Sequence, residues 1–398
     1  MTSPLRDIRR RELGGPDPLD RRLGVPTQTP LTWLRTLLFT RSALGLSPSL
    51  TPAVVFLPVG FLLGPRGLSL LSPTVLSRLD LAVTIALAVL GVLVGIALGR
   101  EIRSSTRLFV AASLESLVTI GAVTGATIYF ARATDLPIGA PLAAFGLALG
   151  LCASASSATS ADPDSEPSAE VATRVADLDD VVPIAVAGMG FGLLAPVPVQ
   201  DTLLLAAVTP VIAGLAVGAI GWLLFERSES GAERAVFLLG ALALAGGAAA
   251  ALRVSPLAVG LVAGLCWTIA PGRADRIVQD DLGKVQHPLV VLLLVTAGAL
   301  WTPSVVSLWL LAPYLLFRLT GKVAGAWVSA RIVDVSAADL AAFLVPPGVL
   351  AVAFALNFRQ LLPPDAGDTL LSAVVIGTAA FDLFALAVVP HWRRRPVG

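Results

Sequence analysis

Apolar residues along the chain gather into long blocks separated by short polar connections. The blocks lie at about residues 50–72, 80–99, 107–131, 138–160, 171–196, 202–225, 234–252, 255–271, 287–303, 305–331, 338–358 and 368–390. A helix needs roughly 20 apolar residues to cross a hydrocarbon core about 30 Å thick, and most of these blocks approach that length. The pattern therefore predicts an all-α polytopic membrane protein with about twelve transmembrane helices.

The first 48 residues do not fit this pattern. Residues 1–30 are polar and rich in Arg and Pro, without the continuous apolar stretch of a signal peptide, and predict a solvated cytoplasmic tail. Residues 31–46 are amphipathic but are interrupted by Arg35 and Arg41, which favours a position at the membrane interface. Arginines are concentrated in both tails (1–48 and 393–398) and in one set of loops, so we predict that both termini are cytoplasmic in a multi-pass protein of the cell membrane.

Composition agrees with a protein surrounded by membrane lipid. The chain is 56% hydrophobic and 14% charged, against roughly 25% charged residues in soluble domains. A net charge of +1 and two cysteines give no indication of a nucleic-acid partner or a disulfide scaffold. No cofactor is expected beyond transported ions.

A few polar residues interrupt the apolar blocks. A charge in the middle of a membrane helix costs at least about 2.5–3.5 kcal/mol, so each is a functional hypothesis by default. The candidates are Glu115, Asp177, Asp179, Asp180, Arg318, Lys322, Asn357 and Asp382.

Lys322 is unusual because only two of the 28 basic residues are lysines, and this one lies in the middle of an apolar block. A buried lysine changes its protonation readily, whereas arginine keeps its proton. Two alternatives stay open: Lys322 is only a structural counter-ion for an aspartate, or Arg318, about one turn earlier, is the functional cation.

Asp179 and Asp180 lie about eight residues into the block 171–196, near the middle of a continuous helix. Adjacent side chains point about 100° apart, so one carboxylate can face Lys322 while the other faces a water-filled cavity. Such a pair can hold protons or a small hard cation such as Na⁺. The alternative is that the helix begins after Asp180 and the pair lies on a solvated cytoplasmic face.

Two blocks are interrupted at corresponding positions. The fourth block, 138–160, ends in a Ser/Thr-rich stretch followed by Asp162-Pro163, and the eleventh, 338–358, contains Pro346-Pro347-Gly348. Broken helices at matching positions of two halves are typical of inverted-repeat secondary transporters, whose binding site lies where the breaks cross. We therefore expect inverted repeats with two broken crossing helices, in spans 4 and 11.

Several segments resemble the monovalent cation:proton antiporter superfamily, in its electrogenic branch with paired aspartates. The resemblance covers about residues 50–392 and rests on FLLGPRGLSLL, VADLDDVVP, SPLAVGLVAGL, LTGKVAGAWVSA and VVIGTAAFDLFAL. It implies that Asp180 is the main carboxylate for Na⁺ and protons, that Asp179 pairs with Lys322, and that Thr159 lies at the helix break. After Thr159 the connection is acidic and shorter than the family pattern, which leaves the second half of span 4 open.

The resemblance also implies an organisation and an activity. Helices 3–5 (101–200) and 10–12 (305–392) would form a core that moves against scaffold helices 1–2 (49–100) and the linker and scaffold helices 6–9 (201–304), within a homodimer. The core would exchange small monovalent cations, Na⁺ or else Li⁺ or K⁺, for protons by alternating access.

Two other classes of protein have less support. A sodium-coupled symporter of an organic anion, on a related fold, would need a substrate-sized polar cavity, whereas the buried polar residues here are mostly ion-sized carboxylates. An intramembrane enzyme is not expected. The two adjacent acids are on one helix, and the only histidines, His287 and His391, lie at span ends.

Overall fold

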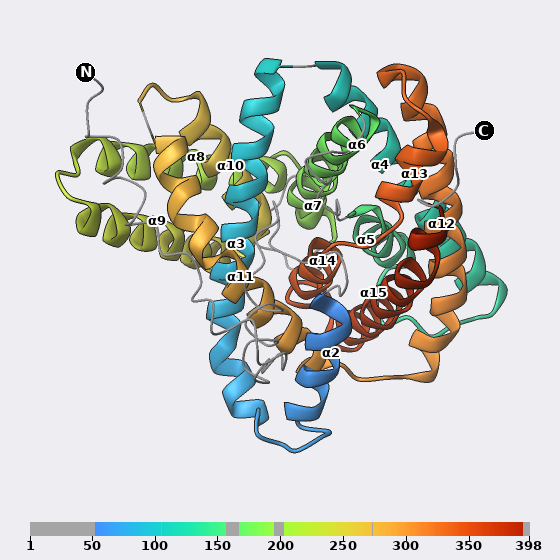
Figure 1. Cartoon of the computed structure of the whole chain (residues 1–398). Coiled ribbons are helices and arrows are strands. Elements are labelled where there is room, and N and C mark those ends of the chain that lie inside the picture. Colours follow the sequence, from blue (N-terminus) through green and yellow to red (C-terminus); the bar gives the residue numbers. More distant parts are fainter. Residues whose placement is uncertain (1–51, 105, 157–166, 195–202, 273, 393–398) are drawn as a thin grey trace, which may run out of the picture. The chain divides into compact units, whose positions relative to one another are not determined.

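The computed structural model describes residues 52–104, 106–156, 167–194, 203–272 and 274–392. Every regular element in these ranges is an α-helix (Figure 1). The helices are α2 (Pro52–Leu63), α3 (Pro73–Ser104), α4 (Thr106–Ala133), α5 (Leu142–Ser154), α6 (Pro167–Leu178), α7 (Val181–Leu194), α8 (Leu203–Arg227), α9 (Gly231–Leu252), α10 (Pro256–Ile269), α11 (Ala274–Leu300), α12 (Val305–Val333), α13 (Ala337–Leu344), α14 (Val349–Arg359) and α15 (Pro364–Trp392). The N-terminal tail, the interfacial segment 31–46, Thr159 and the tail 393–398 lie outside the described residues.

The predicted all-helical membrane fold is confirmed. Within the described ranges, seven helices are long and apolar enough to cross a membrane, and the bent pair α13–α14 brings the number to eight. Each of the other predicted blocks contains a shorter apolar helix or, at 171–196, two consecutive helices. The chain is thus a multi-pass membrane protein, while the number of twelve spans stays a prediction.

The aspartate-bearing block differs from the continuous helix that we expected. It consists of α6, which ends at Leu178, and α7, which begins at Val181, so Asp179 and Asp180 occupy the junction. Pro183 explains the interruption, because it has no N–H to donate to the carbonyl four residues earlier, that of Asp179. The Ser116 hydroxyl of α4 donates to that carbonyl instead, at 2.5 Å.

The break predicted in span 11 is present. α13 and α14 are bent by 51° around Pro346, Pro347 and Gly348. In span 4, α5 ends at Ser154 and Ala155 is extended, with the following residues from 157 to 166 outside the described part. α5 and α14 pack against each other, as the predicted crossing requires.

Two helix pairs form the closest contacts on either side of this crossing. α3 packs along α10, and α4 packs along α12 (Figure 1). Both pairs use glycines to bring the helices together, as membrane helices commonly do. α4 and α12 carry Glu115 and Lys322 into the interior, where both side chains are fully buried.

Candidate functional site

Lys322 lies between two carboxylates that come from different elements. Its Nζ atom is 3.1 Å from the Glu115 carboxylate of α4 and 3.0 Å from Oδ2 of Asp179 at the α6–α7 junction. All three side chains have no exposed surface. Buried charges are tolerated when they are paired and hydrogen-bonded, and this arrangement meets that requirement for Lys322. The Asp179 pairing is as the resemblance implied, whereas Glu115 as a second partner was not anticipated.

The broken end of α5 supplies further acceptors to Lys322. Nζ donates to the Ser154 carbonyl and, at 2.7 Å, to Oγ of Ser156. The Ser156 hydroxyl in turn donates to Oδ2 of Asp179. Glu115, Asp179, the Ser154 carbonyl and the Ser156 hydroxyl make four acceptors around Nζ. An ammonium group has only three N–H donors, one fewer than these acceptors. The site therefore contains one more acceptor than Lys322 needs.

The paired aspartates are buried, with Asp179 exposing 0% and Asp180 3% of its surface. The alternative of a solvated face is therefore wrong for this pair. Oδ1 of each aspartate is buried and accepts no hydrogen bond from the residues that the structure describes. Within the described part of the chain, each carboxylate therefore has one buried oxygen without a hydrogen-bond partner, and carboxylate oxygens are groups that can bind protons or hard cations.

Arg318 has a different role from the one considered in the sequence. Its guanidinium donates to the carbonyls of Ala153 and Ala155 at the end of α5, and to that of Val345 at the end of α13. Helix C-termini leave carbonyls without partners and carry partial negative charge. One buried arginine therefore caps both broken helices, and it is Lys322 that contacts the carboxylates.

Of the remaining candidates, Asn357 and Asp382 are buried, whereas Asp177 of α6 is only partly buried. Asn357 of α14 donates to Oγ of Ser255 at the start of α10, at 3.1 Å. Asp382 of α15 is 2% exposed and follows Phe381, whose ring lies 5.1 Å from the Arg318 guanidinium carbon. Glu115, a secondary candidate, belongs to the centre of the site. The Thr119 hydroxyl holds it in place at 3.0 Å.

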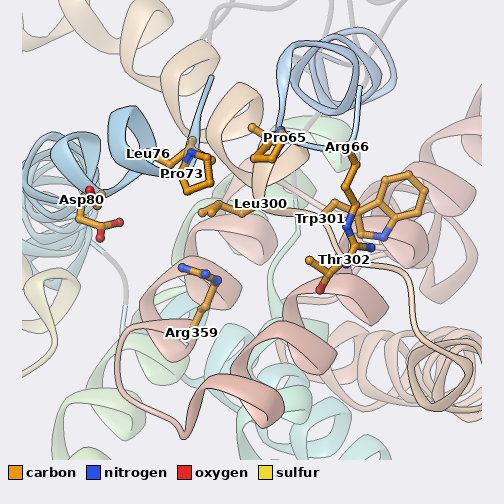
Figure 2. A pocket seen from close by; sticks show the side chains of 11 residues that line it. Pro65, Arg66, Pro73, Leu76, Asp80, Leu300, Trp301, Thr302 and Arg359 are labelled. Atoms are coloured by element: carbon orange, nitrogen blue, oxygen red, sulfur yellow. The ribbon is translucent and has the colours of Figure 1, made fainter. Parts of the chain in front are cut away.

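A cavity of about 250 Å³ opens where α3, the end of α11 and the end of α14 meet (Figure 2). Arg66, Asp80 and Arg359 are the charged residues in its wall, and Trp301 and Thr302 complete one side. Neither aspartate of the pair lines this cavity, and Lys322 does not line it either.

Two features of the site could not be found by looking for charges in apolar blocks. Ser116 and Ser156 position Asp179, but serine is common in membrane helices, so its presence there does not indicate a functional site. Pro183 is the one local signal for these contacts. A proline four residues after Asp179 leaves the Asp179 carbonyl without its helical donor, so a neighbouring helix has to supply one.

Comparison with known proteins shows the fold. No protein-family model matches the chain, and no curated protein sequence does. Among solved structures, it is similar to the sodium proton antiporter MjNhaP1 from Methanocaldococcus jannaschii at pH 8. The TM-score is 0.59 and the sequence identity 15%, over 85% of this chain and 93% of that chain. The chain therefore has a sodium/proton antiporter fold, as expected, while membership of the paired-aspartate branch stays a prediction.

Proposed function

We propose that this protein exchanges Na⁺, or else Li⁺ or K⁺, for protons across the membrane by alternating access. The observation that carries the proposal is the pair of buried, adjacent carboxylates at Asp179 and Asp180 near a buried lysine, each with one oxygen that has no hydrogen-bond partner among the described residues. The fold shared with a sodium proton antiporter supports the same class of activity.

In the proposed cycle, protons and one cation compete for the same carboxylate oxygens. Asp180 is the main ligand because no side-chain hydrogen bond or ion pair with a described residue is seen for it, whereas Asp179 is engaged by Lys322 and Ser156. Cation loading draws Asp179 away from Lys322, and proton loading releases the cation. Two protons per cation would make the exchange electrogenic.

Movement of the core against the scaffold would alternate access to this site. The contact between Asn357 and Ser255 joins α14 to α10, and the contact between Gln360 and Thr84 joins the α14 end to α3 at 3.2 Å. Both are single hydrogen bonds between neutral side chains, each worth about 1 kcal/mol. Such contacts are weak enough to break and reform in each cycle.

The membrane orientation and assembly belong to the same proposal. The concentration of arginines in one set of loops supports cytoplasmic termini in the cell membrane. Exposed apolar side chains such as Ile212 on α8 and Val236 and Leu239 on α9 offer surface for lipid or for the second copy of a homodimer.

The test is sodium-dependent proton movement in proteoliposomes that contain a pH-sensitive dye. The wild-type protein should alkalinise or acidify the lumen according to the direction of the sodium gradient. Asp180→Asn should reduce the signal to that of empty vesicles, because an amide cannot exchange a proton. Asp281→Asn, the same change beside the exposed Lys284, is the matched control and should remain active. Undiminished exchange by Asp180→Asn would refute the assignment.

A further inference from the structure

Glu115 gives the site a third carboxylate, which the proposed cycle does not use. The buried charged side chains of the described chain are four acids and two cations: Glu115, Asp179, Asp180, Asp382, Arg318 and Lys322. Arg318 is occupied by the carbonyls at the helix breaks. Lys322 is bonded to two of the acids, Glu115 and Asp179.

The acceptors around Lys322 remain sufficient when Asp179 leaves. Without Asp179, the ammonium group still has the Glu115 carboxylate, the Ser154 carbonyl and the Ser156 hydroxyl. Three acceptors match its three N–H donors, and Glu115 supplies the compensating charge. A buried ammonium that is left without a charge partner would lose its proton more readily, but here a partner remains.

We propose that Glu115 is the standing counter-ion of Lys322, so that Lys322 keeps its proton throughout the cycle and Asp179 carries the second transported proton. This inference rests on the proposed cation/proton exchange and assigns its protons to Asp179 and Asp180. Because Glu115 neutralises Lys322, Asp179 can be protonated without leaving an uncompensated ammonium. Glu115 is thus a positioning residue that sets the number of protons per cation.

Charge counting predicts what Glu115→Gln does. With Glu115 present, the ionised site has three carboxylates and one ammonium, and two protons neutralise it. With a neutral amide at this position, protonating Asp179 would leave Lys322 unpaired, so Asp179 stays ionised and only Asp180 takes a proton. The exchange should fall from two protons per cation to one and become electroneutral.

The first measurement is the voltage dependence of sodium/proton exchange in proteoliposomes, with the membrane potential clamped by a potassium gradient and valinomycin. Exchange by the wild-type protein should respond to the potential, whereas exchange by Glu115→Gln should not. Glu170→Gln makes the same change at an exposed site beside Arg174 and should keep the voltage response. A voltage response retained by Glu115→Gln, or absent from an active wild-type protein, would overturn the inference.

A second measurement needs no change at the site. Lys284 and Lys322 are the only lysines, and Lys284 is largely exposed, so Lys284→Arg makes Lys322 the sole lysine. Nitrogen-15 labelling with lysine then gives one side-chain signal by solid-state NMR, and its chemical shift distinguishes ammonium from amine. We expect ammonium both without sodium and at saturating sodium. A neutral amine in either state would overturn the inference even if Glu115→Gln fails to fold.

The two proposals fail in different ways. If the wild-type protein moves no protons against a gradient of Na⁺, Li⁺ or K⁺, the proposed function fails. If exchange is present but Lys322 becomes neutral on sodium binding, only the role of Glu115 fails.

Discussion

Glycines bring the helices together in both the α3–α10 pair and the α4–α12 pair, but the residues that they meet differ. In the first pair, Gly91 of α3 and Gly260 of α10 are so close to the opposite helix that a Cβ atom would overlap a backbone carbonyl. In the second pair, a Cβ at Gly325 of α12 would lie 3.0 Å from the Cα, Cγ and O atoms of Glu115. The glycine in α12 therefore makes room for both the backbone and the side chain of a charged residue, at a less close approach than in the first pair.

The two contacts also differ in whether they contain buried charge. The α3–α10 contact contains no buried charge among its described residues, and its attraction comes from close packing of backbone and apolar side chains. The α4–α12 contact contains the Glu115–Lys322 ion pair, and the Ser329 hydroxyl also donates to the Ala111 carbonyl across it at 2.6 Å. We therefore expect the first pair to respond to changes of volume and the second to changes of charge.

The largest effect should come from removing the charge of the second pair. Lys322→Met would leave Glu115 and Asp179 buried without their cation, and breaking a buried ion pair costs about 3–5 kcal/mol. Lys284→Met removes the other lysine, which is largely exposed, and should cost less than about 1 kcal/mol. Thermal unfolding in detergent measures both. The double variant Glu115→Gln/Lys322→Met should recover part of the loss. Equal melting temperatures for Lys322→Met and Lys284→Met would contradict the role of the ion pair.

A smaller loss should follow from adding volume to the first pair. Gly260→Ala places a methyl group against the Ala88 carbonyl, and overpacking of this kind costs about 1–3 kcal/mol. Gly240→Ala is the matched control on α9, because nothing lies within 4 Å of the added atom. The melting temperature should fall for Gly260→Ala and stay level or rise slightly for Gly240→Ala, since alanine favours a helix. A lower melting temperature for the control would mean that any glycine change is harmful.

The sequence predicts the positions of the helices in both pairs, but it does not predict every contact between them. Hydropathy locates the helices because it is a local property of the sequence. The resemblance implies the pairing of Asp179 with Lys322 because both residues lie in recognisable motifs. The pairing of Glu115 with Lys322 depends on how α4 is rotated against α12, which is decided by packing between segments about 200 residues apart. The helix break at Asp179 was missed although Pro183 gave a local signal for it.

Arg318 illustrates the same limit. From the sequence it was an alternative to Lys322 as the functional cation, since both interrupt one apolar block. Its partners are backbone carbonyls at two helix breaks, and every residue presents such carbonyls, so no pattern of side chains marks them. Only the three-dimensional crossing of α5 and α14 distinguishes the capping arginine from the lysine that pairs with acids.

The smallest effect on stability should come from Gly325→Ala, which changes volume where we expect charge to matter. The added Cβ lies 3.0 Å from the Cα, Cγ and O atoms of Glu115, so α4 has to shift by a few tenths of an ångström at this residue, whereas a Cβ at Gly260 would overlap the Ala88 carbonyl oxygen. The gain in helix propensity, up to about 1 kcal/mol, offsets much of this crowding, and the melting temperature should fall less than for Gly260→Ala. The shift moves Glu115 relative to Lys322, so the sodium concentration for half-maximal exchange in proteoliposomes should change while the voltage response is kept. A melting temperature as low as that of Gly260→Ala, with unchanged sodium dependence, would show that both pairs only fasten helices.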